Sequence, residues 1–405
     1  MTASLACRPS RRGFLCLATQ AGAIGVCGCL KGSRHKLDRC ASAIEVREKP
    51  ASIDPIPLAT PVLSESNVDN LLRLVCPEPK LHKYPIAYLY HGLRLWGKEA
   101  RFPSLNFVNP IVEESGWCQS AFDALRDNDA YRRLVDPVGK PLLTLSEFGV
   151  RVLTTKDLGY GTEWKSAHPG AYEQVMAELG VPSSLELRVK DRGDARLVNL
   201  IQDSARRVHR DIECEWSAIS LGMYLASHRW KNRFGEWVDF DMLADWLMSK
   251  VPGQGACYGT HVPYAMTLLH RLGREGKQAL SSKIVAKLDR TLVERTSLLA
   301  KALSPNGTWD AKWGKYITTK NEAVLHKHRD LVRVICTGHH LEWMSYRPCK
   351  SRIPESLLRK VVLFLASALP EFEAALRADW FLQLPLSHAV RAICNLHGVI
   401  PRSVS

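Results

Sequence analysis

Two short segments of the chain combine cysteine and histidine at the same spacing. Residues 257–264 and 336–343 both read Cys-x-Gly-x-His-x-x-aromatic. On a helix, residues i and i+4 lie on the same face, so each segment would present a thiol beside an imidazole. The two pairs Cys257/His261 and Cys336/His340 could together supply the S2N2 ligand set that suits zinc. The alternative is that the cysteines are small core residues and the histidines hydrogen-bond within the protein.

A second candidate chemistry is proton transfer between glutamate and histidine. Glu215 and Glu342 each precede a tryptophan, and two carboxylates beside tryptophans suit the hydrolysis of sugars or their binding by stacking. Histidines nearby would allow general acid–base catalysis. The alternative is that each glutamate simply lies in the first turn of a helix, where the dipole favours it. The candidate catalytic residues are His168, Glu215, His261, His340, Glu342 and His388.

The spacing of these residues predicts the elements that position them. Polar residues at expected helix starts occur at positions 91, 168, 215, 261, 340 and 388, with gaps of 77, 47, 46, 79 and 48. A gap near 47 is the length of a helical hairpin, and the longer gaps leave room for inserted loops. We therefore expect an all-α fold, an (α/α)6 toroid whose inner helices begin at one central cleft. Trp216 and Trp343 should lie near this cleft. His91 belongs to the set by its spacing, with a position apart from the cleft as the alternative.

The remaining pattern divides the chain into three parts. Residues 1–45 read as a leader, residues 46–66 as an extended linker containing four prolines, and residues 67–401 as the helical domain. Within the domain, residues 141–155 alternate apolar and polar side chains, which is compatible with one small β-hairpin around Glu147–Gly149.

Three motifs carry a resemblance to known proteins. They are Thr337-Gly338-His339-His340-Leu341-Glu342-Trp343, Gly259-Thr260-His261 and Asn306-Gly307-Thr308-Trp309. Together they resemble exported bacterial proteins of α/α-toroid type and, more distantly, the terpenoid cyclase and prenyltransferase superfamily. The resemblance covers roughly residues 80–400 and implies the toroid fold. The chain has neither the Asp-rich motif of class II cyclases nor the Asp…Cys…His zinc set of protein prenyltransferases, so it does not imply either activity.

The N-terminus predicts export. Arg11 and Arg12 precede Phe14-Leu15 and a weakly apolar run from Cys16 to Leu30, an order that resembles a twin-arginine signal. The sequence Val26-Cys27-Gly28-Cys29 loosely resembles a lipoprotein box, which would place a lipid on Cys29. The expected location is the periplasm or the cell surface, with membrane contact only through the leader or this anchor. The alternative is a disordered basic tail.

Composition narrows the classes of function. Residues 1–40 contain seven Lys/Arg and one Asp, so they carry +6 of the formal charge of +14, and no nucleic-acid-binding motif accompanies the rest. Five of the 12 cysteines lie in the leader, and the other seven are too widely spaced for a disulfide scaffold. We expect a monomeric exported protein with a His/Glu-lined cleft, a hydrolase or lyase acting on a glycan or another polar ligand. The alternative is a non-catalytic binding or scaffold protein.

Overall fold

The computed structural model describes residues 44–76, 86–99, 121–134, 141–153, 168–189, 192–314, 316, 328–346, 353–378 and 382–401. All of them belong to one compact unit, Ser42–Ser405. The unit is mostly helical with a few short strands, as predicted. The expected leader falls almost wholly outside the described residues. No helix in the described ranges has the length and apolar character needed to cross a membrane.

The helices fall into an inner and an outer set. The inner set is α2 (Ile86–Trp96), α6 (Ala171–Glu178), α8 (Glu215–Tyr224), α11 (His261–Arg274), α14 (Arg329–Ser345) and α17 (Gln383–His397). The other α-helices are α1 (Glu65–Leu74), α3 (Ala121–Arg126), α4 (Asn128–Leu134), α7 (Leu197–Arg207), α9 (Phe240–Ser249), α10 (Ala256–Gly259), α12 (Ser282–Ala302), α15 (Glu355–Ala368) and α16 (Glu373–Ala378). Two 3-10 helices, Ala311–Trp313 and Leu369–Phe372, complete the described helical elements.

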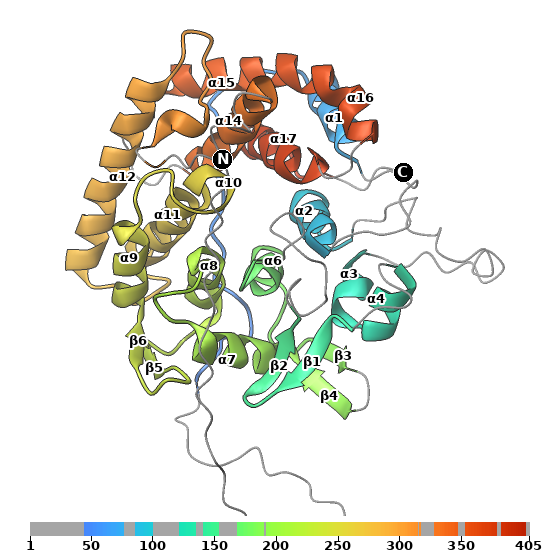
Figure 1. Ribbon diagram of the computed structural model, residues 1–405, viewed down its shortest axis with the longest axis vertical. Coiled ribbons are helices and arrows are strands. Elements are labelled where there is room, and N and C mark those ends of the chain that lie inside the picture. The colour runs from blue at the N-terminus through green and yellow to red at the C-terminus, as the bar shows by residue number, and fades with distance from the viewer. Residues whose placement is uncertain are drawn as a thin grey trace, which may run out of the picture. The chain divides into compact units, whose positions relative to one another are not determined.

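The inner helices pack in a closed order. Helix α2 packs on α6, α6 on α8, α8 on α11, α11 on α14, α14 on α17, and α17 again on α2 (Figure 1). Outer helices flank them: α7 lies against α8, α9 and α12 against α11, α15 against α14, and α1 against α17. All ten residues of α8 are buried, which is expected of a helix that is apolar on every side.

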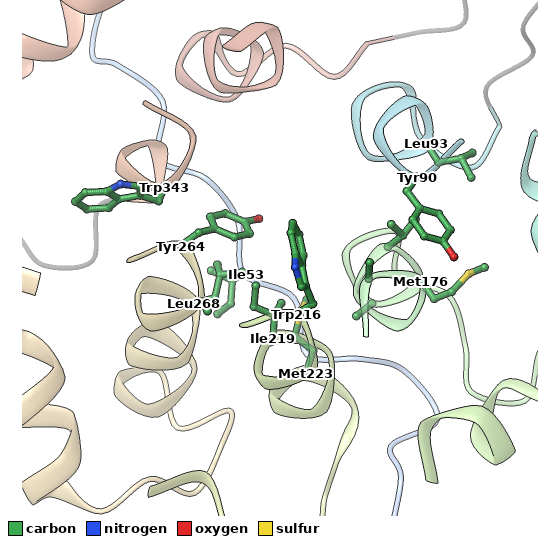
Figure 2. Packing of buried hydrophobic residues seen from close by; sticks show 14 of the residues in the cluster. Ile53, Tyr90, Leu93, Met176, Trp216, Ile219, Met223, Tyr264, Leu268 and Trp343 are labelled. Carbon is green, nitrogen blue, oxygen red and sulfur yellow. The ribbon is translucent and has the colours of Figure 1, made fainter. Parts of the chain in front are cut away.

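Large apolar side chains fill the space between neighbouring inner helices. Trp216, Ile219 and Met223 of α8 belong to the same core cluster as Tyr264 and Leu268 of α11 (Figure 2). Burial of such side chains supplies most of the free energy of folding. This packing holds the inner helices in place, so the polar side chains that they carry have fixed positions.

An extended N-terminal segment, residues 44–63, crosses the C-terminal ends of the inner helices; we call it the strap. Its backbone N–H groups donate at 2.9 Å from Ala51 to the carbonyl of Met223 and at 2.8 Å from Ile56 to that of Ser345. Leu58 donates likewise at 2.8 Å to Leu396. The last carbonyls of a helix have no partner within it, and the strap supplies donors for α8, α14 and α17. The predicted linker is extended as expected, but it is packed onto the domain.

Three two-stranded antiparallel hairpins occur in the described part of the chain. The pairing of β1 (Leu143–Ser146) with β2 (Gly149–Val152) confirms the one hairpin predicted from sequence. The other two join β3 (Glu186–Val189) to β4 (Arg192–Arg196) and β5 (Arg229–Lys231) to β6 (Trp237–Asp239). Neither of them was predicted from the sequence, and the strands of the β5–β6 hairpin are only three residues long, too short for an alternating pattern to be recognised.

The two Cys-x-Gly-x-His segments differ in conformation, so the prediction that both open a helix is wrong for the second. Gly259 has φ +72° and interrupts the helical conformation just before α11 begins at His261. Gly338 instead lies inside the continuous helix α14. A Cβ at position 338 would lie 2.6 Å from that of Ala389, so glycine there allows α14 and α17 to approach closely. One glycine marks a helix start and the other a helix–helix contact.

Candidate active site

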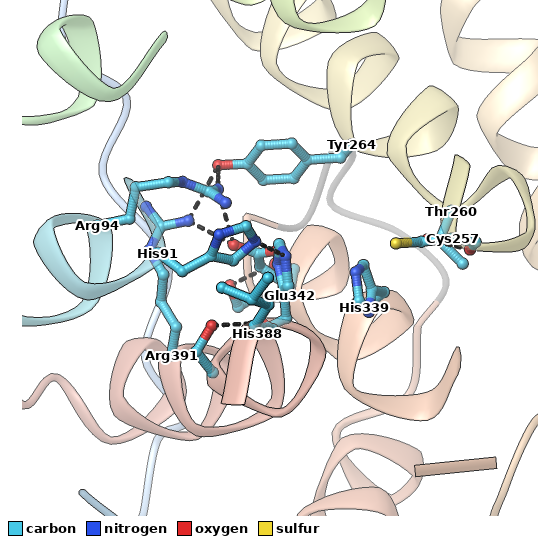
Figure 3. Close-up of polar contacts among 12 residues, drawn as sticks. His91, Arg94, Cys257, Thr260, Tyr264, His339, Glu342, His388 and Arg391 are labelled. Atoms are coloured by element: carbon cyan, nitrogen blue, oxygen red, sulfur yellow. Dashed lines mark hydrogen bonds and ion pairs between the residues drawn. The ribbon is translucent and has the colours of Figure 1, made fainter. Parts of the chain in front are cut away.

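A buried ion cluster joins four inner helices (Figure 3). Its members in the described chain are Arg94 of α2, Glu178 of α6, Glu342 of α14 and Arg391 of α17. Glu342 Oε1 accepts hydrogen bonds from Arg391 at 2.5 Å and from Arg94 at 2.9 Å. Glu178 Oε2 accepts from the same two arginines at 2.8 Å each. The two positive and two negative charges balance, which is what makes such deep burial of ions tolerable.

Tyrosine hydroxyls extend the ion cluster, and Glu342 within it stays charged. Tyr264 donates to Glu178 Oε1 at 2.8 Å, and Tyr346 accepts from Arg391 at 3.2 Å. Burial alone would raise the pKa of Glu342, but His388 and the two arginines hold that pKa well below its usual range. Glu342 is therefore an acceptor and a fixed negative charge, and it cannot donate a proton as a general acid.

Five imidazoles meet beside this cluster; we call them the histidine centre. Ring centroids lie 3.9 Å apart for His339 and His388, 5.3 Å for His261 and His339, 5.6 Å for His168 and His261, and 4.8 Å for His91 and His388. The rings come from α2, the segment before α6, α11, α14 and α17. Five places in the chain thus bring their imidazoles into contact in one buried region.

Three of these rings are fixed in one tautomer. Nδ1 lies 2.6 Å from the Ala87 carbonyl in His91, 2.8 Å from the Ile335 carbonyl in His339, and 2.5 Å from Glu342 Oε2 in His388. These oxygens can only accept, so each Nδ1 carries a hydrogen. Burial lowers the pKa of His91 to about 3, that of His339 to about 4 and that of His388 well below its usual value. Neutral rings of this tautomer present Nε2 lone pairs, as metal-binding histidines do.

His261 lies at the middle of the centre without a hydrogen bond. The residue is 5% exposed, and neither ring nitrogen has a partner among the described residues. The ligating atoms of Cys257, His261 and His339 all lie within 4.8 Å of one another. Burial lowers the pKa of His261 well below its usual value and raises the pKa of the Cys257 thiol to about 12. A thiol and two imidazoles that close together form a plausible ligand set for a transition metal.

A kink in the backbone aims Cys257 at this point. Cys257 and Tyr258 adopt left-handed φ angles of +45° and +60°, which non-glycine residues rarely adopt. Hydrogen bonds hold the kink, because Trp313 Nε1 donates to the Tyr258 carbonyl at 3.0 Å and Thr260 Oγ1 to the Cys257 carbonyl at 2.8 Å. Strained backbone of this kind clusters at functional sites. The predicted i, i+4 helical pairing of Cys257 with His261 is therefore wrong, although the two side chains do meet.

On the other side of His261, a second group of possible ligands includes a carboxylate. Atoms of His168, Glu213 and His261 also lie within 4.8 Å of one another. His168 stacks on Trp216 with centroids 5.0 Å apart, and its Nδ1 lies 2.8 Å from Glu213 Oε2. The indole N–H of Trp216 donates to the other Glu213 oxygen at 3.2 Å. His261 is shared by both groups, which makes it the residue around which the site is built.

Four of the six residues predicted as catalytic belong to this site: His168, His261, Glu342 and His388. His340 points away from it, into a cage formed by Trp309, Trp313 and Trp343. Trp343 donates to His340 Nδ1 at 3.1 Å, so this tryptophan belongs to the cage rather than to the centre. Successive residues on a helix point about 100° apart, and in the continuous helix α14 it is His339 that faces inward.

Glu215 begins α8, as predicted, but it stands outside the ion cluster. It is 2% exposed, and one carboxylate oxygen has no hydrogen-bond partner among the described residues. Burial, together with Glu213, raises its pKa. Glu342 is held by Arg94, Arg391 and His388, whereas Glu215 takes no part in that cluster, so the two carboxyl groups have different surroundings.

Only half of the predicted S2N2 zinc set comes together. Cys336 is fully buried in a small apolar group with Ala311 and Val332, and His340 is enclosed by tryptophans. Both therefore play the packing role that was the alternative for this pair. Cys257 and His261 remain, and His339 joins them in place of the second pair.

A shared spacing identifies the residues that sequence reasoning missed. Four inner helices carry a histidine followed three residues later by a member of the ion cluster or its tyrosine: His91 and Arg94, His261 and Tyr264, His339 and Glu342, His388 and Arg391. Residues i and i+3 lie one above the other on a helix, so a layer of imidazoles lies one turn from a layer of ion pairs. His91, for which a position apart was the alternative, contacts His388 with 3.0 Å between their Nε2 atoms. The i, i+3 pattern was visible in the sequence.

Comparison with protein-family models, curated proteins and solved structures gives no match for this chain. Its function must therefore be argued from the site.

Proposed function

We propose that the histidine centre binds a divalent transition-metal ion, with zinc as the best candidate, and that the chain is a metal-dependent hydrolase of a polar substrate. The proposed ligands are Cys257, His261 and His339. Three protein ligands that leave a fourth position for water or substrate are typical of catalytic zinc, whereas structural zinc has four.

The observation that carries this proposal is His261. An imidazole buried without any hydrogen bond costs about 1–3 kcal/mol per unpaired group, so natural proteins rarely keep one without a reason. A metal ion would satisfy one of its nitrogens and, at the same time, the unpaired Nε2 of His339. The Cys257 thiol would lose its proton on binding, which adds a negative charge to balance the ion.

The remaining residues suit the handling of protons at such a centre. His388 donates from Nδ1 to Glu342, which fixes its orientation and leaves Nε2 as the basic atom. The ion cluster in turn holds Glu342. Hydrolytic triads contain the same kind of carboxylate–histidine pair. There the carboxylate orients the ring and stabilises the imidazolium that forms. A bound metal supplies an activated water with a pKa of ~7.

We also propose that the domain is an (α/α)6 toroid with this centre at its inner end. The closed packing order of α2, α6, α8, α11, α14 and α17, and the outer helices that flank them, support this arrangement. Five of the six inner helices, α2, α6, α11, α14 and α17, contribute a member of the ion cluster or the histidine centre, which supports one central site.

The proposal is tested by metal analysis of the full chain purified without chelators. We expect about one equivalent of zinc, removable by chelator and replaceable by cobalt(II), whose spectrum should contain a thiolate charge-transfer band. Cys257→Ser should abolish that band, and His261→Gln and His339→Gln should each weaken zinc binding at least tenfold.

Cys336→Ala and His340→Gln serve as matched controls, because neither residue belongs to the group of close ligating atoms formed by Cys257, His261 and His339. Circular dichroism establishes that each variant is folded. Loss of zinc in both controls would restore the S2N2 set and overturn our assignment. A folded wild-type chain that neither contains metal nor gains thermal stability from zinc, cobalt or manganese would refute the metal centre.

Activity is tested separately with nitrophenyl acetate, phosphate and β-glucoside. The proposal predicts turnover of at least one ester that chelator abolishes and zinc restores. Metal binding without turnover of any substrate class would favour the non-catalytic binding protein.

A further inference from the structure

A cavity of about 290 Å³ adjoins the histidine centre at His168. It lies near the lower end of the roughly 300–1,000 Å³ range of small-molecule sites. Its walls come from α2, β2, the segment before α6, α6 itself, α7 and the β5–β6 hairpin. None of the three proposed metal ligands lines it, so it is a distinct site.

Charge in the cavity is predominantly positive. Arg151, Arg207 and Arg233 line it, together with His168 and His209. Against them stand two carboxyl groups, Glu173 and Asp203. Asp203 is 2% exposed, pairs with Arg207 and accepts a hydrogen bond from Ser146, so its charge is already compensated.

Two polar groups inside the cavity have unusual surroundings. The Tyr90 hydroxyl is buried and has no hydrogen-bond partner among the described residues. Glu173 is 7% exposed, and burial raises its pKa to about 7, with Asp203 adding to the rise. A protonated Glu173 would carry no charge and could itself donate a hydrogen bond, as the Tyr90 hydroxyl can. With Glu173 protonated, the cavity offers several donors and a positive potential.

We infer that this cavity binds a small oxyanion, held by Arg233 and by the Tyr90 hydroxyl, and that Glu173 is protonated in the complex. An ionised Glu173 would repel the ligand, so binding takes up one proton wherever Glu173 is charged in the free protein. Since the cavity reaches the histidine centre at His168, an anionic group here would hold a substrate beside the metal. That role rests on the proposed function, whereas anion binding itself does not.

The groups that face Glu173 come from each neighbouring helix. Tyr172 lies on its own helix α6, Tyr90 on α2, Asp203, Ser204 and Arg207 on α7, and Tyr224 on α8. Burial raises the pKa of Tyr90 and Tyr172 well above the usual value and that of Tyr224 as well, so the three phenols remain neutral. Within the described chain, Glu173 is thus the carboxyl in the cavity whose protonation changes near neutral pH.

Sulfate is the appropriate probe, because its charge does not change between pH 5.5 and pH 8.5. Calorimetric titration of the full chain, treated with chelator, separates this site from the metal. Sulfate affinity should be nearly constant at low pH and fall about tenfold per pH unit above the pKa of Glu173. Repeating the titration in buffers of different ionisation enthalpy should give uptake approaching one proton per sulfate at pH 8.

Glu173→Gln should retain binding but lose both the pH dependence and the proton uptake. Arg233→Gln should weaken sulfate binding at least fivefold, whereas Arg229→Gln, which removes the same charge from the same hairpin outside the cavity, should not. Undetectable binding at millimolar sulfate would overturn the inference. So would proton uptake that persists in Glu173→Gln, because a histidine would then be the group that titrates. Neither result would bear on zinc binding.

Discussion

The Nε2 atoms of His91 and His388 lie 3.0 Å apart, and each ring uses its only neutral-state hydrogen elsewhere. Two lone pairs at hydrogen-bonding distance repel each other unless a proton lies between them. The ring of His388 is also stacked on that of His339. Because burial lowers the pKa of both rings, they stay neutral and this contact is a repulsion inside the histidine centre.

Replacing His91 by glutamine should relieve this repulsion, because a glutamine amide can donate to His388 Nε2. We expect the chelator-treated His91→Gln chain to be as stable as wild type or up to about 1 kcal/mol more stable. His91→Ala should be less stable by about 1–3 kcal/mol, since it leaves a gap in a buried site. Chemical denaturation of both variants measures the difference. Equal destabilisation by the two substitutions would argue that packing alone fixes residue 91.

Breaking the ion cluster should be far more damaging than breaking a surface pair. Glu342→Gln leaves Arg94 and Arg391 with one carboxylate between them, and loss of one partner from a buried ion pair costs about 3–5 kcal/mol. Glu355→Gln is the matched control, because Glu355 pairs with Arg359 at 2.8 Å with both side chains about one-third exposed. Its cost should be below about 1 kcal/mol. Similar denaturation midpoints for the two variants would contradict the burial argument.

Glu173 predicts a specific pH dependence of stability. Its carboxyl titrates near the ordinary value of 4.5 when unfolded and near 7 when folded. Between these values the folded state holds a proton that the unfolded state has lost, so the free energy of unfolding falls as pH rises and levels off above pH 7. The fall should reach about 3 kcal/mol. Glu173→Gln should remove this component, visible as the difference between the two pH–stability curves. Parallel curves would show that Glu173 is not the responsible group.

The export prediction rests on residues outside the described structure. Arg11→Lys combined with Arg12→Lys should retain the protein in the cytoplasm, because twin-arginine recognition reads the guanidinium pair and lysine does not replace it. Fractionation of cells that express each form measures this. An unchanged location of the double variant would count against the twin-arginine interpretation of residues 1–45.

The helical character of the domain was predictable because apolar residues recur at helical spacing through most of it. The hairpin at residues 143–152 was predictable from alternation, while strands as short as Arg229–Lys231 give no such signal. The start of α14 was not predictable, because the sequence around Gly338 indicates a helix start although this glycine lies inside the helix. Glycine is needed at position 338 because Ala389 approaches it closely, and no local sequence pattern contains this tertiary contact.

The candidate site was predictable in part, from the helical spacing of its residues. His261 and His388 are placed by their helices, and helical spacing anticipates that they face inward. The choice of His339 over His340 depends on the rotation of α14 about its axis, which packing against α17 sets. The ion cluster requires charges from residues as far apart in the chain as Arg94 and Arg391, and no single segment predicts which distant arginine neutralises which glutamate.

The strap has a consequence for the order in which the chain can fold. Leu58 hydrogen-bonds to Leu396, so a segment synthesised among the first must wait for the last helix to be made. Contacts between such distant residues carry a large loop-closure entropy and slow folding. Until α17 emerges from the ribosome, the strap can pair with α8 and α14 but not with α17, and the histidine centre lacks His388. Assembly of the site is in this sense a late event of synthesis, completed only when the two ends of the domain meet.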